Sequence, residues 1–130
     1  MLVDELVRDQ AQTLVTTTES TPLIEVINVF TATKVSALIV TDETGQTVGI
    51  LSEQDVVRSI ARFGPGAFTY PISRVEREDL VKCSCNEPVK LLARRMVVDG
   101  LRHVAVFRGG VLVGVISSED LLSCLAQDRH

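Results

Sequence analysis

Apolar residues along the chain change their spacing several times, and each change marks the boundary of a short element. After Pro22 and after Pro88 they recur at the spacing i, i+3, i+4, i+7. A stripe with this spacing covers one face of a helix, and proline is tolerated in the first turn of a helix. We therefore predict helices from about residues 22 and 88, the second ending at Gly100. The stripes are Leu23, Val26, Ile27 and Phe30, and Val89, Leu92, Ala93, Met96 and Val97.

Two pairs of β-rich runs follow these helices, and each pair is joined by a turn rich in Asp or Gly. Such pairs are typical of hairpins. The predicted hairpins are residues 35–40 with 48–51, and residues 101–107 with 111–116. A short extended piece precedes each helix, at 14–17 and 80–83, and a closing helix follows each hairpin, at 53–62 and 118–127.

The order of these elements indicates an internal duplication. Residues 15–62 can be aligned with residues 81–127 at an offset of 66 that becomes 65 within the hairpin turn. Between the copies, residues 63–71 contain two glycines and two prolines, which predicts a linker. One copy alone would leave its sheet and helix stripes poorly covered. We therefore expect an α/β fold of two β-α-β-β-α repeats packed with pseudo-twofold symmetry, residues 1–66 with an N-terminal helix and residues 67–130.

Composition narrows the class of protein. The chain has 130 residues, of which 45% are apolar and 23% charged, which suits a compact domain and excludes a disordered chain. No apolar run approaches the roughly 18 residues of a membrane span, and the acidic N-terminal segment does not resemble a signal peptide. We expect a cytoplasmic protein with no membrane association. The formal net charge of -4 argues against nucleic acid as a partner.

Each predicted hairpin runs directly into the same motif, glycine, two apolar residues, serine, two further residues and aspartate. The copies occupy residues 49–55 and 114–120. A structural interpretation is a capping box, in which the serine and the aspartate stabilise the start of the closing helix. A functional interpretation uses the same geometry, because a helix N-terminus attracts phosphate and a carboxylate can accept hydrogen bonds from a ribose diol. Two equivalent copies favour binding, and the interpretations are compatible.

These motifs, together with KVSALIV at residues 34–40 and LRHVAV at residues 101–106, resemble a tandem pair of cystathionine β-synthase (CBS) domains of the stand-alone bacterial type. The resemblance covers nearly the whole chain. It implies a regulatory module without catalytic activity or a catalytic cofactor. It also implies two clefts between the repeats that bind adenosyl ligands such as AMP, ADP, ATP, NAD(H) or S-adenosylmethionine.

The resemblance also assigns residues to the two clefts. The aspartate would contact the ribose, the serine and nearby basic groups the phosphate, and the strand-edge backbone the adenine. The first cleft, which we call the Arg102 cleft, would contain Ser52, Asp55, Asp79, Val81, Leu101, Arg102 and His103. The second, which we call the Ser36 cleft, would contain Ser117, Asp120, Thr13, Val15, Val35, Ser36 and Ala37.

Charge ranks the two predicted clefts. Residues 1–65 hold 4 Lys or Arg and 9 Asp or Glu, whereas residues 66–130 hold 9 and 8. Arg102 offers a fixed fork of donors for phosphate, and His103 can add positive charge when it is protonated. We therefore predict the tighter binding of an anionic ligand in the Arg102 cleft. Three departures from the family leave the choice of nucleotide open: Glu76-Arg77 in place of Met-Thr, Ser36 in place of glycine and Cys85 in place of proline.

Other chemistry has less support in the sequence. The three cysteines, Cys83, Cys85 and Cys124, are too few for a structural zinc site of four cysteines and are an odd number for a disulfide framework. We predict reduced thiols and no metal site. No serine or cysteine has a recognisable base and oxyanion arrangement beside it, so we do not expect an enzyme.

Apolar residues on the closing helices indicate packing between repeats or between subunits. They are Val56, Val57 and Ile60, and Leu121, Leu122 and Leu125. The family resemblance implies that such helices pair in a homodimer. Two functional hypotheses therefore stand beside each other: a nucleotide sensor that acts on an unknown downstream protein, and a dimerisation or interaction scaffold with vestigial clefts. A small enzyme or metal protein is the third and weakest alternative.

Overall fold

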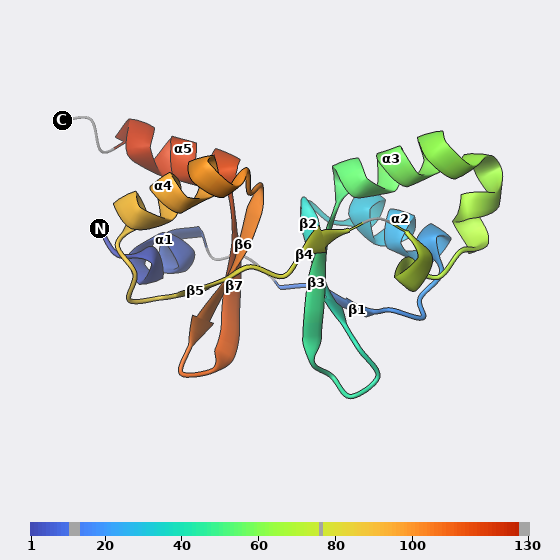
Figure 1. Cartoon of the computed structure of the whole chain (residues 1–130), viewed down its shortest axis with the longest axis horizontal. Helices are drawn as coiled ribbons and strands as arrows, with labels where there is room; N and C mark the ends of the chain where they lie inside the picture. The colour runs from blue at the N-terminus through green and yellow to red at the C-terminus, as the bar shows by residue number, and fades with distance from the viewer. Residues whose placement is uncertain (11–13, 76, 128–130) are drawn as a thin grey trace. The chain divides into compact units, whose positions relative to one another are not determined.

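The computed structural model describes residues 1–10, 14–75 and 77–127, and the chain packs as two compact units. Residues 15–80 form one of them, which we call the continuous unit. Residues 1–14 and 81–130 form the other, which we call the split unit (Figure 1). The sequence predicts repeats divided between residues 66 and 67, whereas packing groups the first residues of the chain with the second half.

The continuous unit contains the predicted order of strand, helix, hairpin and helix. Its four-stranded sheet has the order β1-β2-β3-β4, in which β1 and β2 are parallel and the other pairs antiparallel. The elements are β1 (Thr16–Thr18), α2 (Leu23–Ala32), β2 (Ala37–Thr41), β3 (Thr47–Ser52), α3 (Glu53–Phe63), η1 (Gly64–Thr69), η2 (Ile72–Arg74) and β4 (Glu78–Asp79). The short edge strand β4 has no counterpart in the sequence prediction.

The split unit repeats this order with one strand fewer. Its sheet has the order β5-β6-β7, with β5 parallel to β6 and β6 antiparallel to β7. The elements are α1 (Val3–Gln10), β5 (Lys82–Ser84), α4 (Val89–Asp99), β6 (His103–Arg108), β7 (Val111–Ser117) and α5 (Ser118–Gln127). Figure 1 shows α4 and α5 side by side over one face of this sheet. The mixed α/β fold expected from the sequence is confirmed.

The predicted apolar stripes form the two cores, except that Val97 of α4 is 82% exposed and the prediction that it is buried is wrong. Leu23 and Val26 of α2 pack on alternate residues of β2 and β3, and Val89, Leu92 and Met96 of α4 do the same on β6 and β7. The prolines predicted in the first helical turns are the N-cap residues of α2 and α4. Gly100 ends α4 in the left-handed conformation, with a φ of 65°, which glycine adopts without steric cost. Sequence periodicity therefore locates these helices to within about one residue.

The predicted linker at residues 63–71 is wrong in one respect, because most of it is ordered as the 3₁₀ helix η1. Ala67 in η1 is fully buried, and Ile72 and Val75 just after it belong to the core of the continuous unit. Pro65 lies in the first turn of η1, where proline is tolerated. The glycine and proline after Phe63 therefore mark the end of α3. The apolar residues Ala67, Ile72 and Val75 complete the core of the continuous unit.

The segments at residues 1–4 and 70–73, which we call docking segments, make equivalent hydrogen bonds. In the split unit backbone amides donate to backbone carbonyls, from Val3 to Glu87 (2.9 Å), from Asp4 to Cys85 (2.8 Å) and from Val89 to Met1 (2.9 Å). In the continuous unit they are Ile72 to Thr21 O (3.0 Å), Ser73 to Glu19 O (3.0 Å) and Leu23 to Tyr70 O (2.9 Å). The duplication thus extends further toward the start of each repeat than the sequence alignment indicates. Residues 1–4, at the start of the first repeat, therefore pack in the split unit. Residues 70–73, near the start of the second repeat, pack in the continuous unit.

Candidate functional site

The glycine-to-aspartate motif lies in both units where the last strand of the hairpin passes into the closing helix. In the continuous unit β3 ends at Ser52 and α3 begins at Glu53; in the split unit β7 ends at Ser117 and α5 begins at Ser118. Ser52 has an extended backbone, with φ of -97° and ψ of 165°, which is usual for an N-cap residue. The strand therefore presents the helix N-terminus together with its cap.

Both motifs form the capping box that the structural interpretation predicts. In the continuous unit Asp55 N–H donates to Ser52 Oγ (3.2 Å) and Ser52 N–H donates to Asp55 Oδ2 (2.9 Å). In the split unit Asp120 N–H donates to Ser117 Oγ (3.0 Å) and Ser117 N–H donates to Asp120 Oδ2 (2.9 Å). The motif is therefore a structural element in both copies, whatever else it binds.

The first amide of each closing helix has a partner as well. Glu53 N–H donates to the carbonyl of Ser36 (3.2 Å), and Ser118 N–H donates to the carbonyl of Arg102 (2.9 Å). These acceptors occupy equivalent positions just before β2 and β6. Because three backbone amides at each N-terminus already have acceptors, a phosphate here would depend more on hydroxyl and cationic side chains.

The two aspartates differ in their surroundings. Asp55 is 4% exposed, and its second oxygen, Oδ1, lies 3.3 Å from Nη1 of the half-exposed Arg58. Asp120 is less deeply buried, and the residue of its helix equivalent to Arg58 is Ser123. A carboxylate has about four lone-pair positions, so Asp55 can still accept hydrogen bonds from a diol beside Arg58. Arg58 thus gives the continuous unit a cation at the motif that sequence analysis missed, although its three-residue spacing from Asp55 was available.

Two of the strand-edge residues assigned to the clefts are paired directly with the motif serines. Ala37 is paired with Ser52 across the hairpin of the continuous unit, and His103 is paired with Ser117 in the split unit. The carbonyls of Val15 and Val81 accept hydrogen bonds from the amides of β2 and β6, at 3.0 and 2.9 Å. Arg102 is exposed, His103 is 7% exposed, and Asp79 pairs with Gly49 on β4. Val35 is half-buried before β2, Leu101 is half-buried before β6, and Thr13 lies outside the described residues.

Comparison with protein families decides what this duplicated arrangement is. The model of the CBS domain matches residues 4–62 and again residues 72–127. The chain belongs to the CBS domain family. The matches begin at residue 4 and at residue 72, so each includes only the end of a docking segment.

Solved structures of CBS proteins share this fold. A CBS-domain containing protein from Agrobacterium tumefaciens, ATU1752, is 28% identical with a TM-score of 0.85, over 95% of this chain and 92% of the other. The CBS domain pair of protein MJ0100, in complex with 5′-methylthioadenosine and S-adenosyl-L-methionine, is 21% identical with a TM-score of 0.81, over 99% and 98%. The second likeness establishes the fold alone.

Two curated relatives are longer than this chain. Protein MJ1225 of Methanocaldococcus jannaschii is 27% identical over 97% of the chain and 45% of its own length. The gamma-3 subunit of 5′-AMP-activated protein kinase of Sus scrofa is 30% identical over 82% of the chain and 22% of its own length. The chain therefore spans less than half of each of these relatives.

Each CBS unit brings together its own share of the predicted site residues. Ser52 and Asp55 lie with Ser36 and Ala37 in the continuous unit, whereas Ser117 and Asp120 lie with Arg102 and His103 in the split unit. The predicted clefts take these sets in the opposite combination, and that combination stays a prediction. Within a unit, the motif and the strand start are joined by backbone bonds of the hairpin.

No disulfide joins Cys83, Cys85 and Cys124 of this CBS pair. Cys83 and Cys85 are buried in the split unit, and burial together with the negative charge of Glu87 raises the pKa of Cys83 to about 12. A thiol with this pKa stays protonated at neutral pH and is a poor nucleophile. Among residues 1–10, 14–75 and 77–127, no three histidine, cysteine or acidic side chains gather in a way that could hold a metal ion. In the same residues, no helix is long and apolar enough to cross a membrane.

Proposed function

We propose that this CBS pair is a non-catalytic regulatory module that binds an adenosine nucleotide, AMP, ADP, ATP or NAD(H), or a related adenosyl ligand in clefts between its repeats. The observation that carries the proposal is the occurrence of the same serine and aspartate box, on the same strand-to-helix junction, in both units. Two relatives support the choice of ligand. One was solved with two adenosyl compounds, and another is a subunit of a kinase named for activation by 5′-AMP.

The proposed roles follow from the chemistry of the side chains. Asp55 accepts hydrogen bonds from the ribose, while Ser52 and the guanidinium of Arg102 contact the phosphate. His103, Val81, Leu101 and Asp79 complete the Arg102 cleft. The Ser36 cleft uses Asp120 and Ser117 in the same roles, with Thr13, Val15, Val35, Ser36 and Ala37. Arg58 adds a second cation beside Asp55, which strengthens the expected preference of the Arg102 cleft for a charged ligand.

Signalling requires that the ligand bind one conformation or oligomer more tightly than another. A ligand present at 100 times its dissociation constant stabilises the state it binds by about 2.7 kcal/mol, which a melting experiment resolves readily. We expect AMP, ATP, NADH or S-adenosylmethionine to raise the melting temperature of the protein. If none of these compounds binds, the proposed function fails.

A matched pair of arginine variants tests the assignment of the phosphate contact. Arg102→Gln and Arg94→Gln each remove one exposed positive charge from the split unit, and only Arg102 lies in the predicted cleft. We expect Arg102→Gln to weaken AMP binding about tenfold or more in isothermal titration, a change of roughly 1.4 kcal/mol. Arg94→Gln is expected to leave AMP affinity unchanged. Equal losses in both variants would indicate a nonspecific effect of net charge.

The two aspartates test the ranking of the clefts. Asp55→Asn and Asp120→Asn change the same position of equivalent capping boxes, and Asp55→Asn also removes the ion pair with Arg58, so the stability of each variant without ligand is measured first. We expect the larger loss of AMP affinity for Asp55→Asn, because the Arg102 cleft carries more positive charge. A larger loss for Asp120→Asn would reverse the ranking.

A scaffold function is the second candidate, and the exposed apolar residues of the closing helices favour it. Val57 on α3 and Leu122 on α5 occupy equivalent positions and are 67% and 70% exposed. Exposed apolar side chains on equivalent helices suit a homodimer interface. We expect Leu122→Lys to increase the monomer fraction in light scattering, whereas Val111→Lys, on β7 and also exposed, leaves it unchanged. A dimer that is unaffected by Leu122→Lys would place the interface elsewhere.

A further inference from the structure

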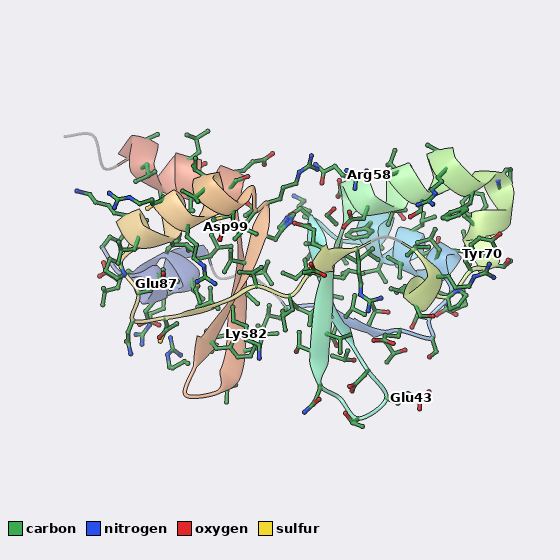
Figure 2. All side chains as sticks on the ribbon, in the orientation of Figure 1. Glu43, Arg58, Tyr70, Lys82, Glu87 and Asp99 are labelled. Atoms are coloured by element: carbon green, nitrogen blue, oxygen red, sulfur yellow. The ribbon has the colours of Figure 1, made fainter. Side chains whose placement is uncertain are left out.

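The split unit contains a surface pocket of about 440 Å³ that the proposed adenosyl site does not use. It is lined by Lys82, Cys83 and Ser84 of β5, by Glu87 and Arg95, by Phe107, and by the Gly109-Gly110 turn between β6 and β7. None of these residues belongs to the Arg102 cleft or the Ser36 cleft. Figure 2 labels Lys82 and Glu87 at two points of this lining. The volume is within the usual range for small-molecule sites.

The pocket combines both signs of charge with an aromatic surface. Glu87 Oε2 and Arg95 Nη1 are 3.9 Å apart, and neither side chain is fully buried. Lys82 Nζ lies 5.0 Å from the centre of the Phe107 ring. Cys83 contributes a neutral thiol to the lining, because its pKa is raised by burial and by Glu87. The pocket thus offers two cations, one carboxylate and one ring within a single unit.

The duplicated fold provides an internal comparison for this set of residues. The equivalent positions of the continuous unit are occupied by uncharged residues: Thr16 for Lys82, Thr17 for Cys83, Thr21 for Glu87, Val29 for Arg95 and Thr41 for Phe107. Both units nevertheless form the same strand, helix and hairpin at this place. The charged set is therefore not required by the fold, which makes a binding role the better explanation for it.

We propose that this pocket binds a small zwitterion of the α-amino-acid class. Its carboxylate is held by Lys82 and Arg95, its ammonium group by Glu87, and its side chain lies against Phe107. A simple anion would leave Glu87 facing a like charge, whereas an ammonium group satisfies it. The loose Glu87 and Arg95 pair, at 3.9 Å, can open to give one partner to each end of the ligand.

A ligand in this pocket would contact a residue that also holds the docking segment of the split unit. The backbone carbonyl of Glu87 accepts the hydrogen bond of Val3 (2.9 Å), which holds the start of α1. Binding at the Glu87 side chain therefore stabilises the residue on which the docking segment rests. The pocket would provide an input independent of the adenosyl ligand, and the proposal does not depend on adenosyl binding.

Titration of the intact chain with each of the twenty common amino acids tests the proposal. We expect at least one to raise the melting temperature and to bind measurably by calorimetry. Lys82→Thr and Arg95→Val introduce the residues of the continuous unit and are expected to weaken that binding about tenfold. Lys90→Thr removes an exposed lysine of α4 outside the pocket and is expected to leave it unchanged. Absence of binding by every amino acid, or equal binding by Lys82→Thr, would overturn the proposal.

Acetate and the Glu87→Gln variant distinguish a zwitterion site from a simple anion site. Glu87→Gln keeps the size of the side chain and removes its charge, so it is expected to weaken amino-acid binding without weakening acetate binding. If acetate binds the unaltered protein as tightly as the amino acid does, the ammonium group contributes nothing and the zwitterion proposal is wrong. Circular dichroism of each variant verifies that the fold is retained.

Discussion

The continuous unit and the split unit share a sheet, two packed helices and a capping box, and they differ in what covers one glycine. Gly49 and Gly114 occupy equivalent positions on β3 and β7, three residues before the capping serine. A Cβ atom at Gly114 would lie 2.9 Å from Val7 Cγ1 of α1. A Cβ atom at Gly49 would lie 2.9 Å from Arg77 Nε and 3.2 Å from the carbonyl of Glu78. One glycine therefore accommodates a helix and the other an edge strand.

This difference shows which parts of the repeat are constrained by packing. From within equivalent docking segments, the chain enters the eight-residue helix α1 in one unit and the three-residue η2 followed by β4 in the other. In both units the covering segment closely approaches the last strand of the hairpin, which is β3 in the continuous unit and β7 in the split unit. The cores and caps are thus held constant, while the cover of the last strand is free to vary.

Truncation of the docking segments is expected to have the largest effect. Ile72 and Val3 occupy equivalent positions, and both are fully buried. We expect Ile72→Ala to lower the free energy of unfolding by about 2–5 kcal/mol, and Val3→Ala by less because it removes fewer carbon atoms. Urea unfolding measures both, with Val98→Ala as the exposed control, expected within about 0.5 kcal/mol of the unaltered protein. A negligible effect of Ile72→Ala would mean that the second docking segment does not support the core.

The close approach at the two glycines is expected to have a smaller effect. Gly114→Ala should cost about 1–3 kcal/mol through overpacking against Val7. Adding Val7→Ala should recover part of the loss, because the conflict is with a side chain. Gly49→Ala should be recovered less by Arg77→Ala, since the carbonyl of Glu78 cannot be removed. Thermal melts measure the series, and Gly66→Ala, which meets open space, is the control. Full recovery in both pairs would remove the distinction between helix and strand covers.

The capping serines are expected to contribute equally. Ser52→Ala and Ser117→Ala each remove the acceptor for an aspartate amide, and each should lower stability by about 0.5–2 kcal/mol. Similar losses in the absence of ligand would show that the boxes are structurally equivalent. Any difference that appears only when AMP is added then reports on binding. A large difference without ligand would contradict the structural equivalence of the two units.

Acid pH is expected to change the stability that the two docking segments contribute, and this is the smallest of the predicted effects. Hydrogen bonds and charge from Arg108, together with Arg8, hold the pKa of Asp4 below its ordinary value of 3.8. Because the folded pKa is lowered, the stabilisation is present above the ordinary value and is lost as pH falls through the lower folded value. The equivalent Ser73 does not titrate. We expect Asp4→Asn to flatten the acid side of the stability profile slightly, and an unchanged profile would show that the Asp4 pairs contribute nothing.

The spacing of apolar residues and the positions of glycine and proline predicted most of the fold, because both depend on the conformation of only a few neighbouring residues. The stripes of α2 and α4 and the end of α4 at Gly100 are examples. The linker prediction failed because glycine and proline in residues 63–71 report only local backbone, whereas Ala67 and Ile72 are ordered by a core formed from distant residues. The docking segment at residues 70–73 escaped detection for the same reason. Its equivalence to residues 1–4 lies in backbone hydrogen bonds, which carry no signature in residue type.

The candidate site was also predicted in part from the sequence. Duplication identified the serine and aspartate boxes, and the structure confirms that both boxes form. Arg58 was missed because a single basic residue on an exposed helix face is common. The pocket of the split unit was also missed, since β5, α4 and the β6–β7 turn contribute to it from separate parts of the sequence. Sequence patterns thus describe sites made of one segment better than sites assembled from several.

The docking of residues 1–4 also determines when the split unit can form during synthesis. Asp4 is bonded to Arg108, which lies 104 residues later in the chain. At ordinary rates of translation the two are made on the order of ten seconds apart. Through that interval the apolar face of α1 has no sheet to cover it, whereas residues 15–80 can already fold. Slower translation would lengthen the time for which the apolar face of α1 is exposed.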